Sequence, residues 1–369
     1  MGQNPVLVEE LKSDSGKIIG HVCLNAPDTL NALSLDMIDQ LSATLTAWQS
    51  NDDVVCVILS GSGEKAFCAG GDVKNLYQSI IDCDYGDNAY ARAFFSREYR
   101  LDYQIHTYGK PLICWGNGIV MGGGMGLMAG ASHRVVTEST VMAMPEVTIG
   151  LFPDVGGTWF LNKMPGRLGL FVGLTGVRMK AADALYARLA DYHLDVMRWR
   201  DVVQALTAAP WDKEPQVNHQ QVSDILSSLA SEPDSASLLQ KYQHRIDPLM
   251  DVASPADVLV NLANPDLPSW FSRPAQVLAK GSPVSAWLVY EQLRRGKALS
   301  LADIFRMELS MAIQCTRHRD FAEGVRALLV ERTNDTGWSH PSIADVAMTQ
   351  VDEYFSVDWP ENRHPLADL

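Results

Sequence analysis

Residues 118–126 read Gly-Ile-Val-Met-Gly-Gly-Gly-Met-Gly and follow an apolar run, Pro111–Trp115, that is typical of a short β-strand. The glycines predict a tight turn that leads into a helix of small residues. The same order occurs earlier, where the apolar strand Val54–Leu59 precedes a glycine-punctuated loop at 61–71 and a helix that starts at Val73. Strand, loop and helix in this alternation predict an α/β fold, built from stacked ββα turns or from another layering of helices on a sheet.

Outward from these loops, the spacing of apolar residues predicts further elements. Ser34 is suited to cap a helix over 35–48, whose apolar residues recur at helical spacing. Beyond about residue 210, prolines interrupt a more polar region, and amphipathic helices follow it. We therefore divide the sequence into a catalytic core at 1–210 and a helical C-terminal region at 211–369. The other expected strands and helices lie at 18–24, 90–108, 135–137, 141–143, 285–295, 301–317 and 321–331.

The composition bounds the classes of function. The chain has 369 residues, of which 47% are hydrophobic and 20% charged, and its formal net charge is -14. This is the composition of a globular protein with a sizeable core. A nucleic-acid partner is disfavoured, because phosphate binding needs a basic face. A small anionic ligand remains open, because a few local Lys, Arg and backbone N–H groups can bind one.

The cysteines and the N-terminal residues bear on the compartment. The six cysteines form no C-x-x-C pair and no cluster with zinc spacing, so we expect reduced thiols, a reducing compartment and no metal. Residues Met1–Glu10 lack the pattern of a secretory signal, and no apolar run reaches the length of a membrane span. We therefore expect a cytoplasmic protein with no membrane partner.

Two glycine-containing loops, at 66–72 and 118–126, each come after a strand and before a helix. Such loops can aim backbone N–H groups outward, and two N–H groups that converge on one oxygen are what acyl transfer requires. Taken singly, each loop is better explained as a tight turn, or as glycines that allow close helix–strand packing, than as a binding site. A dinucleotide or nucleotide site is disfavoured, because no G-x-G-x-x-G opens the first strand–helix unit and no P-loop is present.

A third segment, Met144–Thr158, carries the acids Glu146 and Asp154 within an otherwise apolar sequence. Apolar surroundings raise the pKa of a carboxyl group and suit it to proton transfer near neutrality. The alternatives are a salt bridge for Glu146 and an N-cap for Asp154, ahead of Gly156 and Gly157.

These three segments together resemble the crotonase (enoyl-CoA hydratase/isomerase) superfamily, and the likeness extends back to Asn25-Ala26-Pro27 and Leu30-Asn31-Ala32-Leu33. The resemblance implies a spiral of ββα turns with an α-helical C-terminal region. It also implies an oxyanion hole made by the backbone N–H groups of Gly71 and Gly123. The positions that it implies for substrate binding are Asn31, Ala32, Ala69, Gly70, Asp72, Glu98 and Gly122.

Two positions separate this chain from the hydratases of that superfamily. Gly126 stands where a hydratase carries the Glu of G-G-G-C-E, and Asp154 stands at the first Gly of the hydratase sequence I-P-G-A-G-G. Met144-Pro145-Glu146 followed by Gly150–Gly157 instead resembles the signature of the 3-hydroxyisobutyryl-CoA hydrolase branch.

Two other segments, Phe94–Tyr99 and Asp320–Ala327, also resemble that branch. The span from about 195 to 275 matches poorly. Ala26 in place of the usual Arg, and Glu331–Asn334 in place of the usual D-K-D, are local departures that leave the acids intact.

The resemblance implies hydrolysis of 3-hydroxyisobutyryl-CoA to 3-hydroxyisobutyrate and free CoA, as in valine catabolism, with 3-hydroxypropionyl as a competing acyl group. Glu146 would be the nucleophile or the general base, Asp154 would bind the 3-hydroxyl group or assist protonation of the CoA thiolate, and Glu98 would position the substrate. No metal or redox cofactor is expected. The alternatives are an isomerase with a single Glu, a hydratase, and a catalytically silent acyl-CoA-binding or scaffold protein. A homo-oligomer is compatible with the resemblance.

Overall fold

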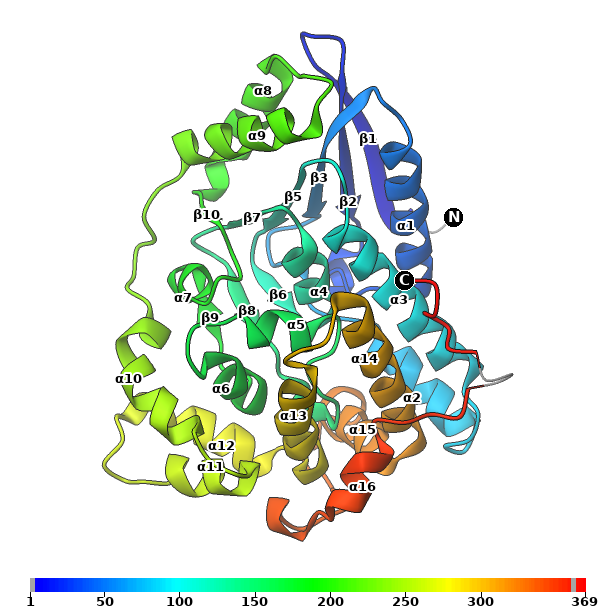
Figure 1. The fold of residues 1–369 in the computed structure, drawn as a ribbon, viewed down its shortest axis with the longest axis vertical. Coiled ribbons are helices and arrows are strands. Elements are labelled where there is room, and N and C mark those ends of the chain that lie inside the picture. Colours follow the sequence, from blue (N-terminus) through cyan, green and yellow to red (C-terminus); the bar gives the residue numbers. More distant parts are fainter. Residues whose placement is uncertain (1–3, 360–362) are drawn as a thin grey trace. The chain divides into compact units, whose positions relative to one another are not determined.

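The computed structural model describes residues 4–359 and 363–369, and they form two compact units (Figure 1). The first, which we call the sheet unit, consists of the residues up to 71 together with 101–142 and 179–240. The second, the helical unit, consists of 72–100, 143–178 and the residues from 241 onward. Each unit is thus assembled from three separate segments. The division of the sequence at residue 210 remains a prediction, and the compact units follow different boundaries.

The sheet unit contains a six-stranded sheet with the strand order β1-β2-β3-β5-β7-β10 (Figure 1). The edge strand β1 runs antiparallel to β2, and the remaining neighbours are parallel. The strands are β1 (Val6–Lys12), β2 (Ile18–Leu24), β3 (Val54–Gly61), β5 (Leu112–Gly116), β7 (His133–Val136) and β10 (Tyr192–His193).

The predicted strands at 18–24 and 54–59 and the helix at 35–48 are confirmed by β2, β3 and α1 (Leu35–Gln49). Residues 54–60 of β3 are all buried, as expected for a central parallel strand. The hydroxyl of Ser34 accepts a hydrogen bond from the N–H of Met37, so it caps α1 as predicted. Strand β1 was not predicted, because its side chains after Val6 are mostly exposed and give no apolar pattern.

A second, four-stranded sheet in the same unit joins the two glycine loops. Its order is β4-β6-β8-β9, and β4 pairs with β6 in parallel. Each of these two strands lies within one of the predicted glycine loops, so part of each loop is strand. The strands are β4 (Ala66–Cys68), β6 (Ile119–Met121), β8 (Val141–Ala143) and β9 (Met179–Lys180). The remaining helices of this unit are η1 (Pro27–Thr29), α4 (Gly123–Gly130), α7 (Ala181–Tyr186), η3 (Val196–Arg198), α8 (Trp199–Ala208) and α9 (Pro215–Leu229).

Helices α8 and α9 lie side by side and cover one face of the large sheet (Figure 1). Their side chains Val202, Leu206, Val222 and Leu226 join an apolar core with residues of β2, β3, β5 and β7. This burial stabilises the sheet unit, because it removes apolar surface from water.

In the helical unit the described residues form no strand apart from the last residue of β8. The residues of its helices α13 and α14 are largely buried. Its elements are α2 (Val73–Asp82), η2 (Glu146–Ile149), α5 (Gly157–Asn162), α6 (Leu168–Thr175), α11 (Pro255–Leu262), η4 (Ser269–Phe271), α12 (Ser272–Lys280), α13 (Pro283–Gly296), α14 (Leu301–Arg317), α15 (Arg319–Val325), a π-helical turn (Arg326–Val330), η6 (Ile343–Asp345) and α16 (Met348–Glu353). Helices α3 (Ala89–His106) and α10 (Leu238–Met250) each contribute residues to both units. The helices predicted at 285–295 and 301–317 are confirmed by α13 and α14. The one predicted at 321–331 is divided between α15 and the π-helical turn.

Candidate active site

The two glycine loops lie against each other in the sheet unit. A Cβ placed on Gly70 would lie 3.7 Å from the carbonyl oxygen of Met121 and 4.0 Å from the Cα of Gly122. A Cβ on Gly124 would lie only 2.3 Å from the carbonyl oxygen of Cys68, a distance that no side chain tolerates. Glycine at position 124 is therefore required by the close approach of the loops. The two loops are therefore in contact, whereas the convergence of their N–H groups on one oxygen remains a prediction.

Backbone conformation fixes where the N–H groups point. Gly70 has φ +121°, and Gly122, the N-cap of α4, has φ 48° and ψ −123°. Both conformations strongly favour glycine. Gly123 is the first residue of α4, so its N–H has no acceptor within the helix. Gly71 forms an isolated parallel bridge with Leu33 at the end of its loop. The role of the Gly71 and Gly123 N–H groups as oxyanion donors remains a prediction.

Asn31 binds the backbone of the first glycine loop and of the residues near it. Its buried side chain accepts a hydrogen bond from the N–H of Ala26 and donates to the carbonyl oxygens of Ser62 and Ala66. These bonds use the amide inside the protein, so the geometry supports a role in shaping the loop. Its predicted contact with substrate, like those of Ala32, Ala69, Gly70 and Gly122, remains a prediction. In the helical unit, Asp72 caps α2 by accepting from the N–H of Asn75 at 3.2 Å.

The helical unit holds a cluster of four buried acids: Glu98, Glu146, Asp154 and Glu308. We call these residues the acid cluster. Asp154 Oδ2 accepts a 2.7 Å hydrogen bond from the hydroxyl of Tyr99. One carboxyl oxygen of Glu98 and one of Glu146 are buried without a hydrogen-bond partner among the described residues. Buried carboxyl oxygens without a partner are rare, and a bound water or ligand is one explanation for them.

Burial governs the protonation of these acids. Burial raises the pKa of Glu146 well above its ordinary value, and the nearby charge of Asp154 raises it further. Burial also raises the pKa of Asp154, to about 6, although the Tyr99 hydrogen bond acts in the opposite direction. The pKa of Glu98 is raised by burial and then by Asp154. A carboxyl group whose pKa is raised toward neutrality, as that of Asp154 is, suits proton transfer.

Both structural alternatives for the two predicted acids are wrong. No ion pair to Glu146 is formed by the residues that the structure describes. The N-cap of α5 is Gly156, and Asp154 does not cap it. The carboxylate of Glu308 takes that role, accepting hydrogen bonds from the N–H groups of Gly156 and Thr158 at 2.7 and 2.8 Å.

Sequence reasoning missed Tyr99 and Glu308 as members of this site. Tyr99 lies in the Phe94–Tyr99 segment beside Glu98, but nothing local shows that its hydroxyl reaches Asp154. Glu308 could have been identified from the sequence, because it lies one turn after Ile304 on the apolar face of an amphipathic helix. A charged residue on an apolar helix face must have a buried partner, and here the partners are backbone N–H groups.

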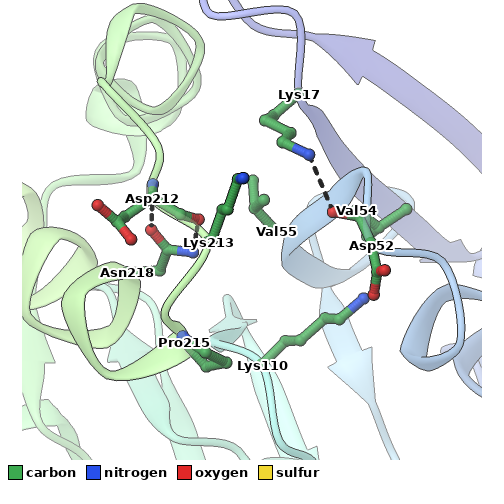
Figure 2. A pocket seen from close by; sticks show the side chains of 9 residues that line it. All are labelled: Lys17, Asp52, Val54, Val55, Lys110, Asp212, Lys213, Pro215 and Asn218. Atoms are coloured by element: carbon green, nitrogen blue, oxygen red, sulfur yellow. Dashed lines mark hydrogen bonds between the residues drawn. The ribbon is translucent and has the colours of Figure 1, made fainter.

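A separate pocket in the sheet unit, with a cavity volume of about 390 Å³, lies where β2 and β3 begin (Figure 2). It contains Lys17, Lys110 and Lys213, but Lys17 Nζ binds Asp53 Oδ1 and Lys110 Nζ binds the carbonyl oxygens of Trp48 and Asn51. Two of its three cations are thus already neutralised or hydrogen-bonded within the protein. None of the predicted site residues lines it.

Among residues 4–359 and 363–369, no cluster of His, Cys, Asp and Glu has the arrangement of a metal site, and no helix is both long and apolar enough to span a bilayer.

Comparison with known proteins identifies the family. A family model described as enoyl-CoA hydratase/isomerase matches residues 19–355. The chain belongs to this family. Among its curated relatives, the mitochondrial 3-hydroxyisobutyryl-CoA hydrolase of Gallus gallus is 36% identical over 91% of this chain and 86% of the relative. The human hydrolase of the same name is 32% identical over 96% of the chain and 90% of the relative. The resemblance inferred from the sequence is therefore confirmed.

Two solved structures of the family confirm the fold class. A carnitinyl-CoA dehydratase from Mycobacterium thermoresistibile has a TM-score of 0.86 at 36% identity and covers 98% of this chain and 99% of its own. An enoyl-CoA hydratase from Rhodobacter sphaeroides 2.4.1 has a TM-score of 0.82 at 30% identity and covers 95% and 97%. The crotonase-like α/β fold with C-terminal helices is thus established, whereas the cytoplasmic location remains a prediction beside relatives that are named mitochondrial.

Proposed function

We propose that this protein hydrolyses a short 3-hydroxyacyl-CoA thioester, and that 3-hydroxyisobutyryl-CoA is its substrate. The observation that carries the proposal is the buried pair Glu146 and Asp154, both with raised pKa, in a chain whose position 126 is a glycine. Hydration of an enoyl-CoA in this superfamily uses an acid at position 126, and this chain lacks it. Relatives named 3-hydroxyisobutyryl-CoA hydrolase, at 36% and 32% identity, support the same reaction.

In this proposal the two glycine loops bind the thioester oxygen. The N–H groups of Gly71 and Gly123 donate to that oxygen, on which negative charge develops when the carbonyl carbon is attacked. Such donors stabilise the transition state more than the bound substrate, and removing one costs about 100- to 1,000-fold in rate.

The helical unit supplies the acids. Ionised Glu146 either attacks the carbonyl carbon, giving an anhydride that water then cleaves, or removes a proton from the attacking water. In both routes the C–S bond breaks, and the CoA thiolate takes up a proton. Asp154 binds the substrate's 3-hydroxyl group or supplies that proton, and Glu98 positions the acyl group. No metal or redox cofactor takes part in either route.

The first test is CoA release from 3-hydroxyisobutyryl-CoA, measured with a colorimetric thiol reagent, with isobutyryl-CoA and the corresponding enoyl-CoA as matched substrates. We expect rapid release from the hydroxylated thioester alone. Conversion of the enoyl substrate without thiol release would show an isomerase or hydratase instead. Absence of turnover with all three would indicate an acyl-CoA-binding protein.

A further inference from the structure

We propose that Glu308 is a positioning residue that holds the turn carrying Asp154, so that a residue of the C-terminal helices sets the geometry of the reaction. This inference rests on the proposed function for its kinetic consequences. Its structural basis lies entirely within the helical unit.

The turn after Asp154 has an unfavourable backbone conformation. Val155 has φ +55°, which is strained for a β-branched residue, and Gly156 follows with φ +84°. The N–H of Gly157 closes the turn on the carbonyl oxygen of Asp154 at 2.7 Å. A strained conformation persists only where surrounding contacts fix it.

Glu308 provides the contacts that fix the end of this turn. It lies on α14, is fully buried, and accepts from Gly156 N–H at 2.7 Å through one oxygen and from Thr158 N–H at 2.8 Å through the other. A carboxylate has an acceptor on each oxygen and can satisfy both donors at once. Burial raises the pKa of Glu308 to about 8, while these two backbone bonds favour its ionised form.

The other side of the turn is held by a neighbouring helix. Gln292 of α13, also fully buried, donates through Nε2 to the carbonyl oxygen of Pro153 at 2.9 Å. Asp154 is therefore flanked by two polar anchors from helices that follow it by more than a hundred residues. Its side chain is held separately, by the hydroxyl of Tyr99. Together these contacts hold the backbone on both sides of Asp154 and one oxygen of its carboxyl group.

The deciding experiment is a double-mutant cycle between Glu308→Gln and Asp154→Asn, followed by thiol release. Glutamine keeps one acceptor and loses the other, so E308Q should lower kcat about 10- to 100-fold, because one buried N–H group is left without a partner. KM should change little. In the D154N background the same change should cost less than about 3-fold, because residues that act through one another are not additive.

A matched control weakens α14 without touching the turn. Ser300 caps α14 by accepting from Asp303 N–H, so Ser300→Ala should lower the melting temperature and leave kcat unchanged. E308Q should also reduce the preference for the hydroxylated over the plain thioester, whereas S300A should not. Equal factors for E308Q in both backgrounds would overturn the proposal, because they would show that Glu308 acts independently of Asp154.

Hydrogen exchange separates this proposal from the proposed function. Exchange of the Gly156 and Thr158 amides should accelerate in E308Q and stay slow in S300A, whatever the substrate proves to be. If the wild-type protein releases no CoA, the proposed function fails and the exchange result alone decides whether Glu308 holds the turn. Unchanged exchange at both amides in E308Q would overturn it.

Discussion

The glycine loops of the sheet unit and the acid cluster of the helical unit are built on opposite principles. The loops present backbone N–H groups, and strand pairing between β4 and β6 together with the absence of side chains fixes their positions. The cluster presents side chains, and buried partners on distant helices fix them: Tyr99 binds Asp154, and Glu308 binds the turn that follows it.

This difference has a chemical consequence. A backbone N–H has the same charge at every pH, so the donor pair keeps its strength across the working range. The acids change charge with pH, and their pKa values depend on burial and on one another. Substitutions in the loops should therefore change activity by displacing backbone N–H groups. Substitutions in the acid cluster should change the pH dependence of activity or of stability.

The largest effect is expected in the acid cluster. In the proposed mechanism Glu146 attacks the carbonyl carbon or activates water, so Glu146→Gln should lower kcat by roughly 1,000-fold or more while CoA binding persists. Thiol release and titration with CoA measure the two quantities. Glu291→Gln is the matched control, because Glu291 is also buried in the helical unit but pairs with Arg294 and Arg295. Near-normal turnover of E146Q would contradict the assignment.

Substitutions in the glycine loops should lower activity by displacing the backbone. Gly124→Ala places a Cβ 2.3 Å from the carbonyl oxygen of Cys68 and forces the loops apart, so kcat should fall about 100-fold through loss of a donor. The pH dependence of the remaining activity should keep its wild-type shape. Gly109→Ala is the control, because a Cβ there meets nothing within 4 Å. If G124A moved the pH profile, the separation between geometry and protonation would not hold.

Asp154→Asn should stabilise the protein at neutral pH. The folded-state pKa of Asp154 is about 6, above its ordinary value of 3.8. The contribution of Asp154 to stability is therefore complete below pH 3.8 and is lost as the pH rises through about 6. The unfolding free energy of D154N minus that of the wild type should therefore increase by up to about 3 kcal/mol between pH 4 and pH 7.

Urea titration at several pH values measures this difference. Asp303→Asn is the control of opposite sign, because hydrogen bonds from Ser300 and Arg306 lower the pKa of Asp303. A difference for D154N that is flat with pH would show that Asp154 does not titrate in this range.

The smallest effect is expected for Tyr99→Phe. Losing the hydroxyl removes one hydrogen bond that lowers the pKa of Asp154, so that pKa should rise above about 6. We expect kcat to fall about 3- to 10-fold, the effect of one hydrogen bond. The pH–rate profile of Y99F measures the shift. Tyr290→Phe, which loses only a bond to the carbonyl oxygen of Val252, should leave the profile unchanged.

The sequence was most informative where structure is encoded locally. The strand at 54–59, the cap at Ser34 and the two glycine loops follow from residue types at short spacing, and all are confirmed. Glu146 and Asp154 stood out as acids in apolar surroundings, and both are buried.

What escaped prediction depends on contacts that short spacing cannot reveal. Glu308 binds an N–H group 152 residues earlier in the chain, and the Tyr99–Asp154 bond joins residues 55 apart. Strand β1 was missed for a different reason, because an edge strand with one buried side chain lacks an apolar pattern. The discontinuous units were also invisible, because no compositional shift marks their boundaries.

The three-segment construction of each unit imposes an order on synthesis at the ribosome. Every segment of the sheet unit is available once residue 240 has emerged, so its sheets can assemble while translation continues. The turn carrying Asp154 has emerged by then, but Gln292 and Glu308, which satisfy its carbonyl and amide groups, have not. The nascent chain must therefore carry an unfinished acid cluster, and the turn after Asp154 cannot hold its strained conformation, until α13 and α14 have been translated.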